Sequence, residues 1–373
     1  MHTPRWPALA LATVLALTSC SGDPEPTEPS TAPTETVEPT ETPEPSETTD
    51  EPTEEPTEEP SATESQQPAL LDWQQVPGPV ADQVTVSGEW SLALPESGDE
   101  ATLDGPEPRT IRPPAGFRIT EALLDGEYAV VVAEHEQASR PNRATVVELS
   151  TGEQSVIDGR SEVPTTVGGT WALGSGLLVH ATMQGRDYCL AVADLVTGRS
   201  RPGPCVPPRH GVSNATVSPA GLAAMTFDDG RPSCRTLNRV EGTAFEPLAG
   251  VEECRGWEAV VTETAAVWGV VPQERRIEAS EFYADSGSGP VELGPGTTGT
   301  LTWCGDAAYV VRDPQRDSDP ARLLRIDPTG STEVVYESAG TGRAFLSAPR
   351  CGGTDLTLTA FTAAGDEQVT ATL

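Results

Sequence analysis

The chain has 373 residues and a formal net charge of −34 at pH 7, and all of its 23 basic residues are Arg. So acidic a balance argues against nucleic acid as a partner, because a negatively charged protein repels the phosphate backbone. The acids are spread unevenly: 15 of them lie in residues 23–68, which contain no basic residue. This uneven distribution indicates that the chain consists of successive regions with different amino-acid compositions.

Residues 1–19 have the pattern of an export signal. Arg5 precedes an apolar run of ten residues, 8–17, which has the length of a signal-peptide core and is too short to cross a bilayer. The run ends in Leu17-Thr18-Ser19-Cys20, which resembles the lipobox of bacterial lipoproteins. The resemblance implies cleavage before Cys20 and lipidation of its thiol and new amine, so that a lipid anchor holds the protein on the extracytoplasmic face of the cell membrane. The alternative is an ordinary secretory signal in which Cys20 is incidental.

Residues 20–68 are predicted to be a disordered tether. After Cys20 they consist almost entirely of Pro, Glu, Thr, Ser and Ala. Such a segment has too little apolar surface to offset the entropy of ordering, and its prolines and like charges extend it. A segment of this kind between a lipid anchor and a folded domain would hold that domain clear of the lipid headgroups.

Residues 69–373 are predicted to form one all-β domain. Short alternating apolar runs are separated by Gly, Asp and Pro turns, and no amphipathic helical pattern of useful length occurs. One turn type recurs along the domain, with spacings of 43 to 47 residues. Its glycines are Gly105, Gly152, Gly198, Gly242, Gly287 and Gly330. This period suits one four-stranded blade of a β-propeller, with the glycine in the turn between the third and fourth strands.

The last repeat is short by one strand. Its three expected strands lie within 343–349, 355–361 and 367–373, where the sequence ends. Residues 70–76 precede the first repeat and have no hairpin partner, so we expect them to supply the missing strand. Such a ring has seven blades and no exposed sheet edge. Six blades with an additional hairpin is the alternative.

The period and turn type resemble the YncE-like and TolB-like (WD40-like) β-propeller lipoproteins of bacteria. The resemblance covers 69–373 and implies a surface binding or assembly module. It does not identify a ligand.

Six cysteines remain once Cys20 is set aside, an even number in a chain with an export signal. Cys189 and Cys205 flank one of the recurring turns, and Cys234 and Cys254 flank the next, so each pair should face across a hairpin. Cys304 and Cys351 occupy equivalent first turns of adjacent repeats, which predicts a bridge between blades six and seven. Metal binding is the rival interpretation, but the chain has no Cys–x–x–Cys or Cys–His spacing to support it.

No catalytic motif stands out, and we expect neither a catalytic residue nor a cofactor or metal. The loops between the second and third strands of five blades do, however, concentrate Arg, whose planar fork suits carboxylate and phosphate groups. The nine residues are Arg140, Arg143, Arg186, Arg231, Arg275, Arg276, Arg312, Arg316 and Arg322. Arg186, Arg231, Arg275 and Arg316 are the candidate ligand-binding residues. The competing interpretation is that these Arg pair with nearby acids, namely Asp187, Asp228, Asp229, Glu274 and Asp313.

The sequence thus predicts a membrane-anchored, non-catalytic scaffold at the cell surface. Its expected partners are a cell-envelope protein or an anionic cell-wall ligand. The alternative is a carbohydrate-active hydrolase or lyase, which would need carboxylates meeting in the channel with one pKa raised.

Overall fold

The computed structural model describes residues 70–373, apart from 274, 318 and 341–342. The predicted signal peptide (1–19), the lipidated Cys20 and the tether (20–68) lie outside the described residues. Within the described part the regular elements are 29 β-strands, and no helix in it could span a membrane.

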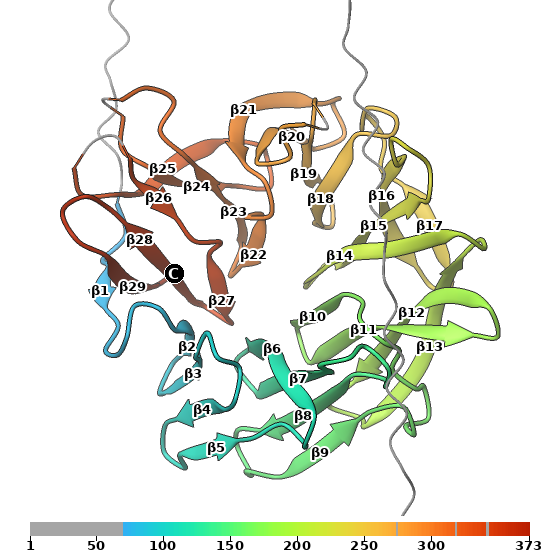
Figure 1. The fold of residues 1–373 in the computed structure, drawn as a ribbon. Helices are drawn as coiled ribbons and strands as arrows, with labels where there is room; N and C mark the ends of the chain where they lie inside the picture. The colour runs from blue at the N-terminus through green and yellow to red at the C-terminus, as the bar shows by residue number, and fades with distance from the viewer. Residues whose placement is uncertain (1–69, 274, 318, 341–342) are drawn as a thin grey trace, which may run out of the picture. The chain divides into compact units, whose positions relative to one another are not determined.

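The strands form seven antiparallel sheets that stand side by side around a central channel (Figure 1). The domain is therefore a seven-bladed β-propeller, as predicted, and the six-bladed alternative is wrong. Blade 1 consists of β2 (Gln83–Ser87), β3 (Trp90–Leu94), β4 (Ala101–Asp104) and β5 (Arg109–Ile111). Blade 2 consists of β6 (Phe117–Leu124), β7 (Tyr128–His135), β8 (Arg143–Glu148) and β9 (Gln154–Ile157). Blade 3 consists of β10 (Trp171–Gly174), β11 (Leu177–Gln184), β12 (Asp187–Asp194) and β13 (Arg199–Val206).

Blades 4 to 6 repeat the same four-stranded order. Blade 4 consists of β14 (His210–Ser218), β15 (Gly221–Asp228), β16 (Arg235–Glu241) and β17 (Ala244–Pro247). Blade 5 consists of β18 (Gly256–Val261), β19 (Ala266–Val270), β20 (Ala279–Asp285) and β21 (Val291–Thr297). Blade 6 consists of β22 (Thr302–Cys304), β23 (Ala307–Arg312), β24 (Arg322–Ile326) and β25 (Thr332–Glu337). The first strand of each blade is the innermost. All six recurring glycines lie between the third and fourth strands and have positive φ, which explains why glycine stands there.

Blade 7 closes the ring with strands from both ends of the domain. β1 (Gln74–Gln75) pairs with β29 (Glu367–Thr372), which pairs with β28 (Asp355–Phe361). The blue and red ribbons meet there in Figure 1. The innermost strand, predicted as one segment, is divided into β26 (Phe345–Leu346) and β27 (Arg350–Gly352), both paired with β28. Pro349 lies in the gap, where it has no N–H to donate to the sheet.

The core lies between the blades. In β7 every residue from Tyr128 to Ala133 is buried, because each face of the sheet packs on a different neighbour. Ala129 and Val131 belong to the cluster shared with blade 1, whereas Val130 and Val132 belong to the cluster shared with blade 3. The second strand of a blade is apolar on both faces for this reason.

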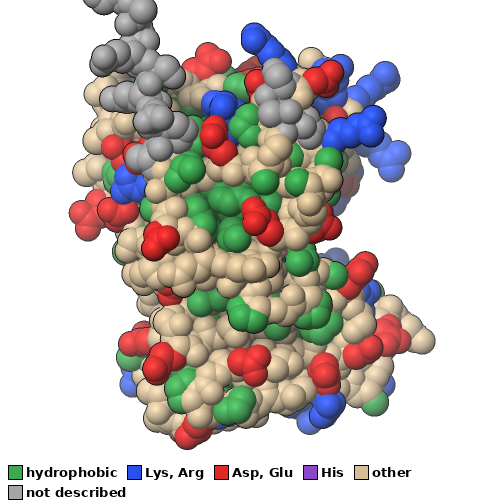
Figure 2. Space-filling model, turned by 90° about the vertical axis from the view of Figure 1, so that its left-hand side faces the viewer, with side chains coloured by type: hydrophobic (Ala, Val, Ile, Leu, Met, Phe, Trp, Pro, Cys, Tyr) green, Lys and Arg blue, Asp and Glu red, His purple; other side chains and the backbone are tan. Residues whose placement is uncertain are grey.

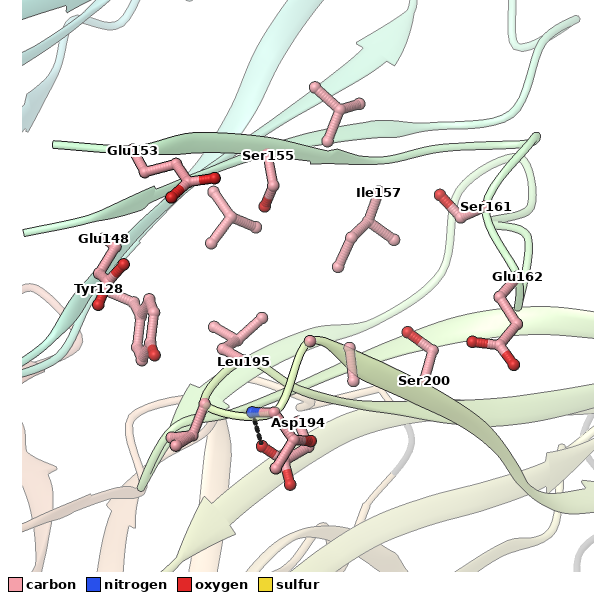
Figure 3. A pocket seen from close by; sticks show the side chains of 16 residues that line it. Tyr128, Glu148, Glu153, Ser155, Ile157, Ser161, Glu162, Asp194, Leu195 and Ser200 are labelled. Atoms are coloured by element: carbon pink, nitrogen blue, oxygen red, sulfur yellow. Dashed lines mark hydrogen bonds between the residues drawn. The ribbon is translucent and has the colours of Figure 1, made fainter. Parts of the chain in front are cut away.

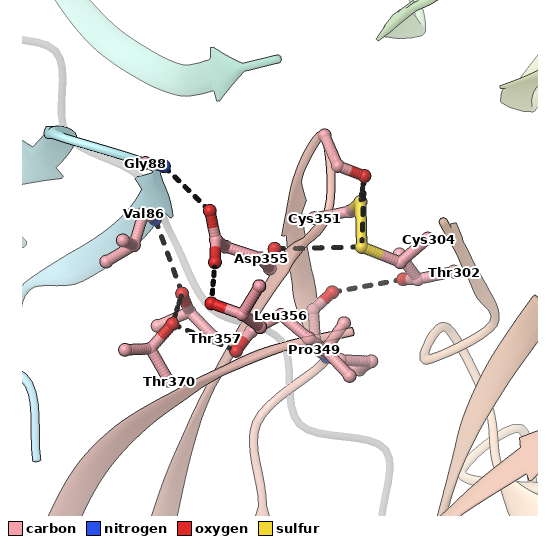
Figure 4. The surroundings of a disulfide bond; sticks show 12 residues. Val86, Gly88, Thr302, Cys304, Pro349, Cys351, Asp355, Leu356, Thr357 and Thr370 are labelled. Carbon is pink, nitrogen blue, oxygen red and sulfur yellow. Dashed lines mark hydrogen bonds between the residues drawn. A yellow bond between two sulfur atoms is a disulfide. The ribbon is translucent and has the colours of Figure 1, made fainter. Parts of the chain in front are cut away.

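The six cysteines form the three predicted pairs. Cys189–Cys205 joins β12 and β13 across the predicted hairpin, whereas Cys254 lies beyond β17, so Cys234–Cys254 joins the loop before β16 to the connection between blades 4 and 5. Cys304–Cys351 joins the innermost strands of blades 6 and 7, with a Cα–Cα distance of 5.4 Å. Figure 4 shows that this third disulfide lies near the contact between blade 7 and blade 1. There the Asp355 carboxylate accepts hydrogen bonds from the Gly88 N–H (2.7 Å) and the Thr372 hydroxyl (2.6 Å).

Candidate functional site

The topology divides the loops between two ends of the propeller. Because the strands of each blade are antiparallel, the loops that join the second and third strands lie at the same end as the loops that connect successive blades. We call this end the loop face. All nine Arg residues singled out in the sequence lie at or near it.

Three of those nine are not in loops, which corrects the prediction. Arg143, Arg312 and Arg322 stand at strand ends and are engaged there. Arg143 pairs with Asp158 (Nη1–Oδ2, 3.5 Å) and Arg322 with Glu337 (Nε–Oε1, 2.7 Å). Arg312 donates to the carbonyl oxygens of Leu293 and Pro295, both at 2.8 Å. Arg143 and Arg322 therefore pair within their own blades, whereas Arg312 joins blade 6 to blade 5, and all three side chains are engaged in the fold.

The other six Arg are exposed, and none forms an ion pair or a guanidinium hydrogen bond with another described residue. They are Arg140, Arg186, Arg231, Arg275, Arg276 and Arg316, and they come from five consecutive blades, 2 to 6. The four candidate ligand-binding residues are all among them. In the side view of Figure 2, basic side chains project together along the upper right edge.

Most of the acids proposed as partners of these Arg are engaged elsewhere. Asp229 makes a two-pronged pair with Arg209, at 2.7 and 3.0 Å. Asp228 accepts the backbone N–H groups of Gly230 and Cys234, and these bonds lower its pKa. Asp313 accepts the Thr297 hydroxyl at 2.7 Å. Glu274 lies outside the described residues.

Five basic residues of the loop face lie in the connections between blades and were missed in the sequence: Arg112, Arg160, Arg209, Arg255 and Arg343. Arg343 lies in the connection between blades 6 and 7 and, with Arg316, lines a hollow of about 290 Å³. The sequence prediction covered only the loops between the second and third strands of a blade. The connections between blades lie at the same end, and counting their Arg residues would have found all five.

The central channel contains a second group of polar residues. A cavity of about 310 Å³ is lined by Trp171 of β10, Trp303 of β22 and Arg350 of β27. The Thr302 and Thr216 hydroxyls on this wall donate to carbonyl oxygens of neighbouring blades. These polar side chains of the wall therefore form hydrogen bonds that join neighbouring blades.

Two glutamates on innermost strands have raised pKa values. Burial raises the pKa of Glu258 from its ordinary 4.5 to about 7, although both carboxylate oxygens accept backbone N–H groups, from Gly299 (2.8 Å) and Leu301 (3.0 Å). This carboxylate fixes the connection into blade 6. Burial also raises the pKa of Glu121 to about 7; Glu134 adds to the increase and Arg350 opposes it. The Glu121 carboxylate has no hydrogen-bond partner among the described residues.

The raised pKa of Glu121 predicts a pH-dependent stability. Below pH 4.5 the carboxyl is neutral in both states. Between about pH 4.5 and 7 the unfolded chain loses the proton that the folded protein keeps, so stability falls as pH rises, and the loss is complete above about pH 7. Glu121→Gln removes this loss. We expect the variant to exceed the wild type by about 3 kcal/mol in free energy of unfolding at pH 8 and to match it near pH 4.5.

Urea unfolding of both proteins at the two pH values measures this difference. Glu258 is present in both and its contribution cancels. A difference in stability that is the same at both pH values would show that Glu121 is ionised normally in the folded protein.

The described residues contain no group of three His, Cys, Asp or Glu side chains that could hold a metal ion. No protein-family model matches the chain, and no curated protein matches it. Many solved structures do. The propeller domain of the Trilobed protease from Pyrococcus furiosus is 13% identical, with a TM-score of 0.55, and the match covers 78% of this chain and 95% of that one. This likeness shows the fold.

Two whole peptidases also match over part of their length. A structure from a study of two prolyl endopeptidases is 14% identical, with a TM-score of 0.49, and the match covers 81% of this chain and 47% of that one. A puromycin-hydrolyzing peptidase of Mycobacterium tuberculosis is 14% identical, with a TM-score of 0.45, and the match covers 75% and 50%. The chain thus spans about half the length of these peptidases.

Proposed function

We propose that this protein is an exported bacterial lipoprotein of the YncE-like or TolB-like kind that binds a partner at the cell surface without catalysing a reaction. The lipid on Cys20 anchors it and residues 20–68 extend the propeller away from the membrane. The loop face binds an anionic group of a cell-envelope protein or wall polymer. The observation that carries this proposal is the set of six exposed Arg side chains, on five consecutive blades, that form no ion pair with another described residue.

The electrostatic setting of these side chains favours binding. A guanidinium without a carboxylate partner can donate two parallel hydrogen bonds to a carboxylate or phosphate. The rest of the domain is acidic, so an anionic ligand is repelled from most of its surface and attracted only where the Arg side chains gather. Charge of this kind mainly sets orientation and association rate.

The anchor is tested by Cys20→Ser. We expect the wild type to fractionate with the membrane and the variant to appear in the soluble extracytoplasmic fraction, because no lipid can be attached. Ser21→Ala is the matched control and should remain with the membrane. Membrane retention of Cys20→Ser would contradict lipid anchoring at this residue.

The loop face is tested by replacing Arg186, Arg231, Arg275 and Arg316 together with Gln. In a pull-down from native cell envelopes we expect the wild type to retain a partner and the variant to retain at least about tenfold less, because each lost charge pair weakens binding by about 1 kcal/mol. As a matched comparison, Arg186→Gln/Arg231→Gln should weaken binding, whereas Arg199→Gln/Arg201→Gln on the outer strand of blade 3 should not. Equal retention by the wild type and the quadruple variant would contradict the proposal.

A hydrolase or lyase acting on carbohydrate is the second candidate, and the pKa of about 7 at Glu121 favours it. A carboxyl that keeps its proton near neutral pH can act as a general acid. Turnover of isolated cell-wall polysaccharide by the wild type and its loss in Glu121→Gln would support this candidate. Turnover unchanged in the variant would exclude Glu121 as the acid.

A further inference from the structure

A cleft lies on the flank of the propeller between blades 2 and 3, and its lining does not include the Arg residues of the loop face. It has a volume of about 530 Å³, within the range of small-molecule sites. One side is formed by β8 and β9 with the loop after them, and the other by the hairpin between β12 and β13 (Figure 3). Neighbouring blades diverge outward, and β9 has only four residues, so the outer strands leave a gap.

The floor of the cleft is apolar. It consists of Val146, Ile157, Ala193 and Leu195, together with the ring of Tyr128. Tyr128 is only 7% exposed, yet its hydroxyl forms no hydrogen bond with another described residue. Figure 3 shows this side chain at one end of the cleft, among the lining residues. The hydroxyl is not one of the buried unpartnered atoms, so it is accessible from the cleft and can form a hydrogen bond with a molecule that occupies it.

The rim of the cleft is acidic. Four carboxylates line it, from Glu148, Glu153, Glu162 and Asp194, and no basic side chain does. Glu148 and Asp194 are held in place, since Glu148 accepts the Thr151 hydroxyl (2.9 Å) and Asp194 the Thr197 N–H (2.9 Å). The Glu153 and Glu162 carboxylates have no such bond with a described residue.

The negative field reaches the tyrosine. Desolvation raises the pKa of Tyr128, and the charges of Glu148, Glu127, Asp125 and Asp194 raise it further. A cation in the cleft would therefore be stabilised, and an anion would be repelled.

We propose that this cleft binds a small organic cation with an apolar body: a primary amine or guanidinium compound. The cationic group lies among the rim carboxylates, the apolar body covers the floor, and the Tyr128 hydroxyl forms a hydrogen bond to it. The cleft shares no Arg residue with the loop face, and the ligand proposed there is anionic, so either proposal can fail alone.

The test uses three probes of one shape, titrated into the full chain by calorimetry: 4-phenylbutylamine, 4-phenylbutanol and 4-phenylbutyrate. We expect the amine to bind with a Kd of about 0.1–1 mM and the alcohol and the acid to bind at least about tenfold more weakly. Added salt should weaken the binding of the amine. Equal binding of amine and alcohol, or no binding of the amine, would overturn the proposal.

The position of the site is tested by Glu153→Gln/Glu162→Gln, which removes two exposed charges that the fold does not use. We expect the affinity for the amine to fall about tenfold, and the loss to be smaller in Tyr128→Phe. The matched control is Glu241→Gln/Glu246→Gln, which removes two exposed charges from blade 4 and should leave the affinity unchanged. Equal losses in the rim variant and the control would show that the amine responds only to net charge, and would overturn the assignment to this cleft.

Discussion

Removing residues 70–76 will prevent the propeller from closing. β1 supplies the outer edge of blade 7, and the backbone N–H groups of Leu71 and Val76 donate to Val335 and Gln368, at 3.1 and 2.8 Å. The Trp73 indole donates to the Val335 carbonyl (2.8 Å) and lies edge-on to the ring of Tyr336. Without this segment β29 becomes an open sheet edge, which is prone to pair with other chains.

Two truncations of the same chain measure the effect. A protein of residues 70–373 should unfold in one transition and remain monomeric, whereas one of residues 77–373 should aggregate or melt at a much lower temperature. Trp73→Ala gives the graded version, with an expected loss of about 3 kcal/mol in free energy of unfolding. Equal melting temperatures for the two truncations would contradict closure by the N-terminal strand.

Removing the disulfide between Cys304 and Cys351 should destabilise the protein more than removing either of the others. Its sequence separation is 47 residues, against 16 and 20 for the other pairs. Because a longer closed loop restricts the unfolded chain more, Cys304→Ala/Cys351→Ala should lower the free energy of unfolding by about 4 kcal/mol, and Cys189→Ala/Cys205→Ala by about 3 kcal/mol.

Urea denaturation of the two double variants beside the wild type gives this ranking. The bridge between blades also opposes opening of the ring, so its loss should increase proteolysis near blade 7. If removal of Cys189–Cys205 lowered the free energy of unfolding more than removal of Cys304–Cys351, the disulfides would stabilise single blades and not the closed ring.

The blades could be predicted because each repeats a local pattern. The turn glycines mark the same place in six blades, and Cys189 and Cys205 flank one of these turns closely enough to predict their pairing. Ring closure followed from counting strands. These features depend on residues near one another in the sequence, or on the number of repeats.

The channel and the flank cleft could not be predicted, because both depend on side-chain direction. β6 has a register shift between Ile119 and Glu121, and β14 has another between Ser213 and Thr216. Each shift changes which residues share a face of the strand, so alternation could not show that Glu121 lies near Arg350 and Glu134. Tyr128 becomes a cleft residue only because blade 3 stands beside it. The hydrogen bonds of the Arg312 guanidinium likewise depend on carbonyl groups of the preceding blade, which the sequence does not place beside it.

The loop face is tested most directly by photo-cross-linking on intact cell envelopes. A photoreactive amino acid is placed at Gln315 in a loop of the loop face, or at Ser331 in the turn at the opposite end of the same blade. Both positions are exposed. We predict a specific cross-linked partner from position 315, lost when Arg186, Arg231, Arg275 and Arg316 are replaced with Gln, and none from 331. Cross-links from 331 and none from 315 would contradict binding at the loop face.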